Sequence, residues 1–384
     1  MSQTDHTSSI TSNHVGLVQT VTCLLHKQQF RSSLQVNTLA SFRNEFLAGM
    51  QTGLTLVIAL IAVHLSPWSH MVGFAGLGSM IALFGRFESR AGRHRMLFQA
   101  ATIQTGSVLI MSCAKWFGFP QPMLLLMLAI MCGIYLFICV TGRYGPPGPL
   151  IFVFAAGSCI GGDVTQQVVI ERTVATGAAA MLGWFICYIT NSLRDLPSAE
   201  KNFPQVPPAP PLTHRLVASL RTIIGTAIAM FIVRYLFDAN YPAWAGMGAL
   251  AVTQGAFLHV SMNRAMQRMV GTTIGAMMAW VVLQVNPNIW GMIAVIGTFQ
   301  VLTEMVIGKN YALGQMFVAP MALLTTHMAA PWFPSENLVP ERILDTLIGA
   351  SIGMVVAVIL SSMDDRRFLA KLHQTTTERN ANSS

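Results

Sequence analysis

The chain has few charged residues for its length. Asp, Glu, Lys and Arg make up 10% of its 384 residues, whereas hydrophobic residues make up 53%. Soluble domains contain roughly 25% charged residues, so these side chains could not cover the surface of a soluble protein of this size. The mean hydropathy of +0.54 agrees with this interpretation. The composition excludes a soluble globular fold and indicates an integral membrane protein.

Motifs for metal binding and catalysis are also scarce. The six cysteines form no C-x-x-C pair, so we expect neither a disulfide framework nor a metal site. The H-E-x-x-H, Walker A and G-x-G-x-x-G motifs are missing, and the polar loops are too short to hold a soluble enzyme domain. We therefore expect no enzyme, no cofactor and no metal, and no ATP-driven export by this chain alone.

The basic residues indicate how the chain lies in a membrane. The net charge of +8 comes from short loops between apolar runs, which membrane topology explains better than nucleic acid binding. If the amino terminus is cytoplasmic, all lysines and arginines fall on the inner side except Lys115, Arg172, Arg234 and Arg342. This bias predicts a multi-pass protein of a bacterial inner membrane with both termini in the cytoplasm.

Apolar runs long enough to cross a bilayer, roughly 20 residues each, recur along the chain. We expect an all-α polytopic membrane protein with about twelve transmembrane helices. They cover approximately residues 45–64, 68–85, 96–117, 122–141, 148–162, 170–190, 217–237, 243–260, 269–285, 289–307, 312–330 and 341–361.

A stretch rich in proline and charge, residues 191–214, divides these runs and indicates an extended cytoplasmic linker. We expect one six-helix half over residues 43–190 and a second over residues 215–361. A cytoplasmic segment, residues 1–42, and a cytoplasmic tail, residues 362–384, flank them. Within the first segment, apolar residues at helical spacing predict either a short surface helix or a flexible tail.

One motif recurs and suggests internal repeats. R-M-V-G-T-T-I-G-A at Arg268–Ala276 returns as R-I-L-D-T-L-I-G-A at Arg342–Ala350, and R-T-V-A-T-G at Arg172–Gly177 is a weaker copy. Arg95 takes the corresponding place earlier in the first half. Because the two strong copies enter the membrane from opposite sides, we expect two parallel halves, each an inverted repeat of three helices. Transporters use such nested symmetry, and chance similarity of helices rich in small residues is the alternative.

The motif itself predicts helix packing. Small residues one turn apart let helices approach closely, and threonines can hydrogen-bond across the contact. We favour packing over direct substrate contact, and we expect the leading arginines to anchor at the headgroups. The residues of this structural motif are Arg268, Gly271, Thr272, Gly275, Arg342, Thr346, Gly349 and Gly353.

Charged residues inside a span are costly and need a role. Glu304 and Asp345 are candidates for proton coupling. The structural alternatives are a pair between Glu304 and Lys309, and a favourable position for Asp345 near the start of a helix. Arg234 could act as an interface anchor or as a contact for an anion.

The fifth and eleventh apolar runs are interrupted by glycine and proline at matching places. Such interruptions are the best sequence indication of a transporter's binding site. The substrate pathway is therefore predicted near these runs, although interfacial anchoring would equally explain a cation beside a tyrosine. The predicted pathway residues are Arg143, Tyr144, Arg234, Lys309, Tyr311 and Pro320.

The second half resembles the FUSC family, named for fusaric acid resistance and including aromatic carboxylic acid exporters. The resemblance rests on R-T-I-I-G-T at Arg221, Y-P-A-W-A at Tyr241–Ala245, R-A-M-Q-R-M-V-G-T-T-I-G at Arg264–Gly275, K-N-Y-A-L-G-Q-M-F-V-A-P-M-A-L-L at Lys309–Leu324 and E-R-I-L-D-T-L-I-G-A at Glu341–Ala350. The first half is similar to a divergent copy of this second half. The resemblance implies efflux of small organic acids driven by the proton gradient. Many members have a large cytoplasmic domain between or after their membrane modules, whereas here a linker joins the halves.

Three functional hypotheses follow. The first is a proton-coupled secondary exporter of aromatic carboxylic acids or related xenobiotics; the alternatives are an organic-anion channel and a membrane assembly partner without transport activity. The expected partners are the lipid bilayer and a small organic anion, with a homo-oligomer or accessory efflux subunits as further candidates. No nucleic acid partner is expected.

Overall fold

The computed structural model describes residues 42–85, 88–194, 209–255, 258–329 and 335–361. Every regular element in these ranges is a helix. The predicted surface helix near residues 15–25, most of the predicted linker and the predicted tail lie outside the described residues.

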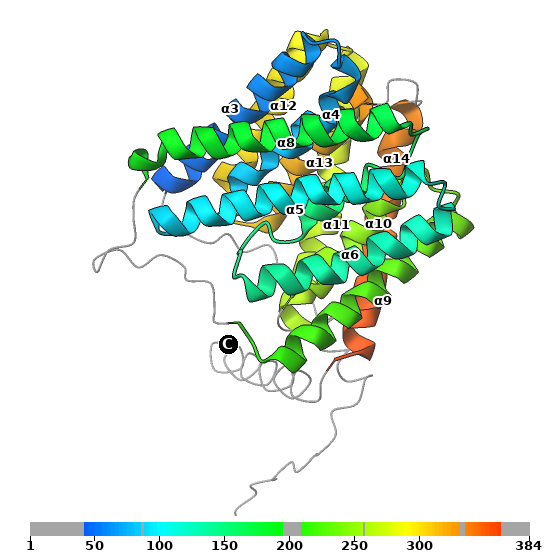
Figure 1. Cartoon of the computed structure of the whole chain (residues 1–384). Helices are drawn as coiled ribbons and strands as arrows, with labels where there is room; N and C mark the ends of the chain where they lie inside the picture. Colours follow the sequence, from blue (N-terminus) through cyan, green and yellow to red (C-terminus); the bar gives the residue numbers. More distant parts are fainter. Residues whose placement is uncertain (1–41, 86–87, 195–208, 256–257, 330–334, 362–384) are drawn as a thin grey trace, which may run out of the picture.

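Eight helices are long and apolar enough to cross a membrane, which confirms a polytopic membrane protein. Their wide apolar faces follow from runs in which charged residues are rare. They are α3 (Phe42–His64), α5 (Arg90–Trp116), α6 (Gln121–Thr141), α8 (Gln166–Ile189), α9 (Leu212–Leu236), α11 (Leu258–Val285), α12 (Ile289–Ile307) and α14 (Ser335–Ile359) (Figure 1).

Four of the twelve expected spans are not among these eight helices, so the count of twelve is not confirmed. They are the second, fifth, eighth and eleventh of the expected runs. The second is split into η1 (Ser69–Met71), α4 (Val72–Ser79) and η2 (Met80–Leu83), while the others are α7 (Leu150–Gly157), α10 (Ala243–Thr253) and α13 (Tyr311–Ala329). Glycine explains two of them, because α4 and α10 are rich in this residue, and Pro320 lies inside α13.

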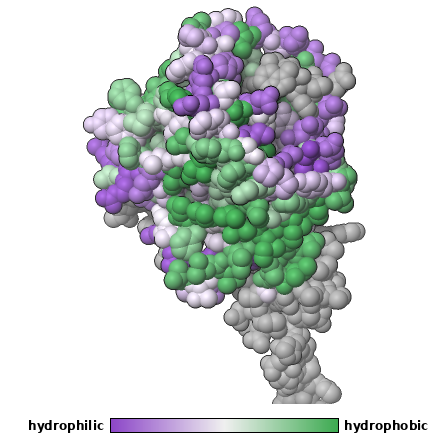
Figure 2. Space-filling model, turned by 45° about the vertical axis from the view of Figure 1, so that its right-hand side comes forward, coloured by the Kyte–Doolittle hydropathy of each residue, from purple (hydrophilic) through white to green (hydrophobic). Residues whose placement is uncertain are grey.

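The four remaining helices, α4, α7, α10 and α13, form the interior, and the eight long helices form the exterior. Every residue of α4 and of α10 is buried. Within the described α-helices, the exposed large apolar side chains all belong to the eight long ones, and Figure 2 shows part of the resulting hydrophobic surface. Lipid tails solvate such side chains as well as a protein core does, so this surface faces the bilayer.

Helix contacts fall into matching pairs. Within the described chain, α5 packs on α8 as α11 packs on α14, and α4 packs on α8 as α10 packs on α14. Between the two parts of the chain, α6 lies against α9 and α3 against α12 (Figure 1), while α7 contacts α10 and α4 contacts α13. The interior is thus made by α4, α7, α10 and α13.

Glycines of the repeated motif sit at two of the closest contacts. A β-carbon on Gly349 would overlap the carbonyl oxygen of Ala245, so α14 approaches the backbone of α10. A β-carbon on Gly275 would lie 2.6 Å from the carbonyl oxygen of Met316 and 2.9 Å from Pro320 Cδ on α13. Each strong copy of the motif therefore packs a long helix directly against a short interior helix.

Replacing Gly349 by alanine is expected to destabilise the contact between α10 and α14, because overpacking of this kind costs about 1–3 kcal/mol. Gly106→Ala on α5 is the matched control, since no atom lies within 4 Å of the added carbon and loss of a helical glycine gains about 1 kcal/mol. Thermal unfolding of the detergent-purified variants should show a lower midpoint for Gly349→Ala and an equal or higher one for Gly106→Ala. Equal midpoints for the two variants would contradict the close approach.

Candidate functional site

Two arginines lie inside the second part of the chain. Arg268 on α11 is 2% exposed and Arg342 on α14 is 1% exposed, and these two helices pack against each other. Arg342 is close enough to Arg268, Asp345 and Tyr311 to interact electrostatically with all three. The expectation that both arginines anchor at the headgroups is wrong, because their guanidinium groups are enclosed by helices.

Aromatic side chains hold these guanidinium groups in place. Arg268 Nη1 donates a hydrogen bond of 3.0 Å to the Tyr311 hydroxyl. The guanidinium of Arg342 lies over the Trp244 ring, 4.8 Å from its centroid, and Tyr241 stacks on Trp244 at 4.6 Å between ring centroids. A cation over an indole face is stabilised by the ring quadrupole, so Arg342 is oriented without using its N–H groups.

Much of the hydrogen-bonding capacity here is unused. Among the described residues, Nε and Nη2 of Arg268 and Nε and Nη1 of Arg342 have no hydrogen-bond partner. Both carboxylate oxygens of Asp345, which is 0% exposed, also lack one, as do the Thr272 and Thr346 hydroxyls. Buried polar groups are normally paired, and a desolvated charge without a partner costs several kcal/mol. The cluster therefore has the donors and the charge to bind an anion.

The corresponding arginine of the first part uses both of its Nη groups on the protein itself, and its Nε has no hydrogen-bond partner among the described residues. Arg172 on α8 stacks over Phe74, 4.9 Å from the ring centroid. Its Nη1 and Nη2 donate to the carbonyl oxygens of Cys159 and Gly161 at 3.3 and 3.4 Å. Ala175 occupies the place in this motif that Asp345 has in the other. Arg172 thus has a structural role, and the two parts differ chemically.

Arg95, which the sequence places opposite Arg268, is not the buried arginine of the first part. It is exposed, whereas Arg93, two residues earlier, is fully buried. Arg93 Nη2 donates to Gln51 Oε1 at 2.7 Å and to the carbonyl oxygen of Ala82 at 3.4 Å. The sequence R-A-G-R-H-R offers three arginines, and spacing alone does not show which of them faces inward.

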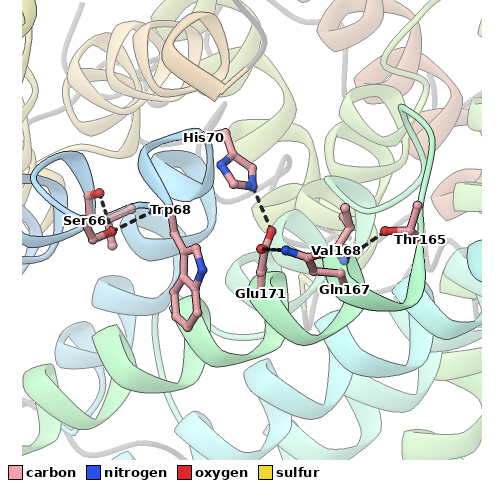
Figure 3. Close-up of polar contacts among 8 residues, drawn as sticks. Ser66, Trp68, His70, Thr165, Gln167, Val168 and Glu171 are labelled. Carbon is pink, nitrogen blue, oxygen red and sulfur yellow. Dashed lines mark hydrogen bonds and ion pairs between the residues drawn. The ribbon is translucent and has the colours of Figure 1, made fainter.

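The glutamates that precede Arg172 and Arg342 each join a long helix to the segment before an interior helix. Glu171 Oε2 lies 2.8 Å from His70 Nε2, and its Oε1 accepts from Gln167 Nε2 at 2.8 Å (Figure 3). Glu341 accepts from the backbone N–H of Tyr241 at 2.6 Å and from Asn240 at 3.1 Å. His70 and Tyr241 precede α4 and α10 respectively. These contacts fix the part of each long helix that carries Arg172 or Arg342 against the segment before an interior helix.

The remaining predicted pathway residues lie at several places. Tyr144 is buried, donates to Gln99 Oε1 at 3.0 Å, and burial raises its pKa to about 12; its neighbour Arg143 is exposed. Arg234 donates to Gln121 Oε1 at 3.0 Å and pairs with Asp238.

In the second part, Lys309 is half-buried just beyond α12. Pro320 packs at Gly275, and Tyr311 reaches Arg268. Of the predicted pathway residues, Tyr311 is therefore the one that the structure brings to a motif arginine.

A second acidic site lies between α3 and α12. Glu304 is 2% exposed and Glu45 is 3% exposed. The Glu304 Cβ would lie 3.3 Å from a β-carbon on Gly49, and the Glu45 Oε1 2.7 Å from one on Gly308. The two carboxylate side chains thus face the same helix contact from opposite sides. Glu45 was missed in the sequence because it is the first residue of the expected span 45–64, where a charged residue at the membrane boundary is ordinary.

Gly349–Gly353 reads G-A-S-I-G and matches the G-x-S-x-G spacing of serine hydrolases. A nucleophilic serine needs the sharp turn between a strand and a helix. Ser351 instead lies exposed in the middle of the continuous helix α14. The spacing here serves close packing on α10.

Residues 218–356 match the family described as fusaric acid resistance protein-like. The second part of the chain therefore carries a region of the FUSC family, which confirms the resemblance read from the motifs. FUSC is a family of membrane transporters, so the match supports a general role in membrane transport or efflux.

A relative with 31% identity over 149 residues is the uncharacterized membrane protein YvaC of Bacillus subtilis (strain 168). The aligned segment is 39% of this chain, and the chain spans 23% of the length of YvaC. No solved structure matches the chain.

The different engagement of the arginines predicts different stability effects. Arg172→Met should lower the free energy of unfolding by about 1–3 kcal/mol, because two buried carbonyl oxygens lose their donors. Arg268→Met should cost less, because a desolvated and mostly unpaired charge is replaced by an apolar side chain. Thermal unfolding in detergent without added anion measures both. A larger loss of stability for Arg268→Met would show that its guanidinium is structural.

Proposed function

We propose that this protein is a secondary efflux transporter of small organic carboxylates, and that Arg268 and Arg342 bind the carboxylate group. The observation that carries the proposal is the unused donor capacity of two buried guanidinium groups. Arginine is well suited to the task because its planar fork matches the two oxygens of a carboxylate.

An aromatic carboxylate fits this environment best. Tyr311 borders Arg268, and Tyr241 and Trp244 stack beside Arg342. The description of the matching family also points to an aromatic acid. Related hydrophobic xenobiotics that carry a carboxylate belong to the same substrate class.

Two parallel halves, each an inverted repeat, would let this site open alternately to the two sides of a bacterial inner membrane. The matching contacts of α6 with α9 and of α3 with α12 support the parallel halves. The packing of Gly275 on α13 and of Gly349 on α10 supports the inverted repeat. The distribution of basic residues supports cytoplasmic termini.

Of the two candidate proton carriers, we assign coupling to Glu304. Two buried carboxyl groups that face the same contact favour the sharing of one proton, and Glu45 lies opposite Glu304 at the contact of α3 with α12. Asp345 instead lies beside Arg342 on α14, away from the contact of α3 with α12. In this scheme a proton enters Glu304 as the carboxylate leaves Arg268 and Arg342.

Arg268→Gln and Arg342→Gln should each reduce benzoate transport in proteoliposomes by roughly 10- to 150-fold, because a hydrogen bond to a charged group contributes about 1.5–3 kcal/mol. Arg95→Gln is the matched control, since Arg95 is exposed, and it should transport like the wild type. Efflux of radiolabelled benzoate measures this. Unchanged efflux rates in both Arg268→Gln and Arg342→Gln would show that these arginines do not bind the substrate.

Glu304→Gln should abolish the dependence of benzoate efflux on a pH gradient but leave benzoate exchange at equal pH intact, because exchange needs no net proton movement. The same proteoliposomes serve for both measurements. Gradient-driven efflux that survives in Glu304→Gln would exclude Glu304 as the proton carrier. Single-channel current steps in planar bilayers would favour the organic-anion channel over the carrier.

A further inference from the structure

A pocket of about 590 Å³ lies at the start of α8. All of its lining residues belong to the first part of the chain, whereas the arginine pair lies on α11 and α14. Figure 3 shows Trp68 and Glu171 side by side along α8. The lining combines polar side chains with an apolar side formed by an indole and an isoleucine. The lining residues are Trp68, Thr165, Gln166, Gln167, Ile170 and Glu171.

Glu171 brings a carboxylate to this pocket. It is 4% exposed, and its two oxygens contact the Gln167 amide and the His70 imidazole, which favours the ionised form. The amide is neutral, and the imidazole is charged only when it is protonated. The adjacent Arg172 is directed to Phe74 and to carbonyl oxygens instead. Each carboxylate oxygen can accept a second hydrogen bond, so Glu171 can still bind a cation.

Trp68 forms another side of the pocket and is held by a turn. Its backbone N–H donates to Ser66 Oγ at 3.1 Å, and Ser66 Oγ donates to the Val63 carbonyl oxygen at 2.7 Å (Figure 3). Trp68 is 38% exposed, whereas Trp244 in the second part is 3% exposed and lies beneath Arg342. An open indole face attracts a cation. A carboxylate beside such a face fits an organic ammonium group.

A line of exposed apolar side chains leads from the pocket along α8. Ile170, Val174, Met181 and Phe185 are all exposed, and their helical spacing places them on one face. Because α8 is long and apolar enough to cross a membrane, this face lies against lipid chains. The pocket at the first turns of α8 therefore lies at the level of the headgroups, where tryptophan is common.

We propose that this pocket binds a membrane lipid whose headgroup ends in a primary ammonium. Glu171 accepts hydrogen bonds from the ammonium, the Trp68 indole covers it, and an acyl chain lies along the apolar line on α8. A headgroup that carries only the negative charge of its phosphate is repelled by Glu171. This site does not depend on the proposed transport of carboxylates.

Native mass spectrometry of the full chain in detergent tests the site with phosphatidylethanolamine and phosphatidylglycerol that have the same acyl chains. The wild type should bind phosphatidylethanolamine at least about tenfold more tightly, and Glu171→Gln should abolish this preference. Trp68→Leu changes an exposed side chain, should lower the preference by about two- to tenfold, and decides the matter if Glu171→Gln does not fold. Glu341→Gln removes the matching glutamate of the second part and should leave the preference unchanged.

Phosphoethanolamine has the same ammonium group but no acyl chain, so it separates a lipid site from a site for a soluble amine. At the same concentration it should leave the bound phosphatidylethanolamine in place. Displacement by this soluble compound, or equal binding of the two lipids by the wild type, would overturn the proposal. So would an unchanged preference in both Glu171→Gln and Trp68→Leu, or a loss of the preference in Glu341→Gln.

Discussion

The burial of two guanidinium groups is the constraint on which the other features depend. A charge removed from water needs compensation. The fold supplies an aromatic face for Arg342, a hydroxyl for Arg268 and one carboxyl group. We propose that an anion uses the remaining donors. The same constraint explains why α11 and α14, which carry the arginines, pack against short interior helices and against each other.

The two parts of the chain have matching helix contacts, but their buried arginines have different hydrogen-bond partners. In both, an acidic residue at the start of a long helix contacts the segment before a short interior helix, and the next residue is an arginine over an aromatic ring. In the first part, main-chain carbonyl oxygens absorb the donors of Arg172. In the second part, the donors stay available. We propose that the second part holds the anion site and that the matching arginine of the first part supports the packing.

The sequence predicted the membrane class, the family and the packing motif. The length of an apolar run and the spacing of glycines are local features that can be read from the sequence directly. The count of twelve spans is not confirmed, since a run such as 243–260 is apolar enough but forms an 11-residue helix that is buried on all sides. The sequence also placed Arg268 and Arg342 at the headgroups, because a charge near the start of an apolar run normally reaches the interface. Which of Arg93 and Arg95 faces inward depends on the rotation of α5 against its neighbours, and spacing does not determine that rotation.

The most direct measurement is an experimental structure of the protein with 4-bromobenzoate, in which the anomalous signal of bromine locates the ligand. The account predicts that the carboxylate lies between α11 and α14, with its oxygens about 2.7–3.2 Å from guanidinium nitrogens of both Arg268 and Arg342. A ligand found elsewhere, with the two guanidinium groups paired to protein acceptors, would contradict it.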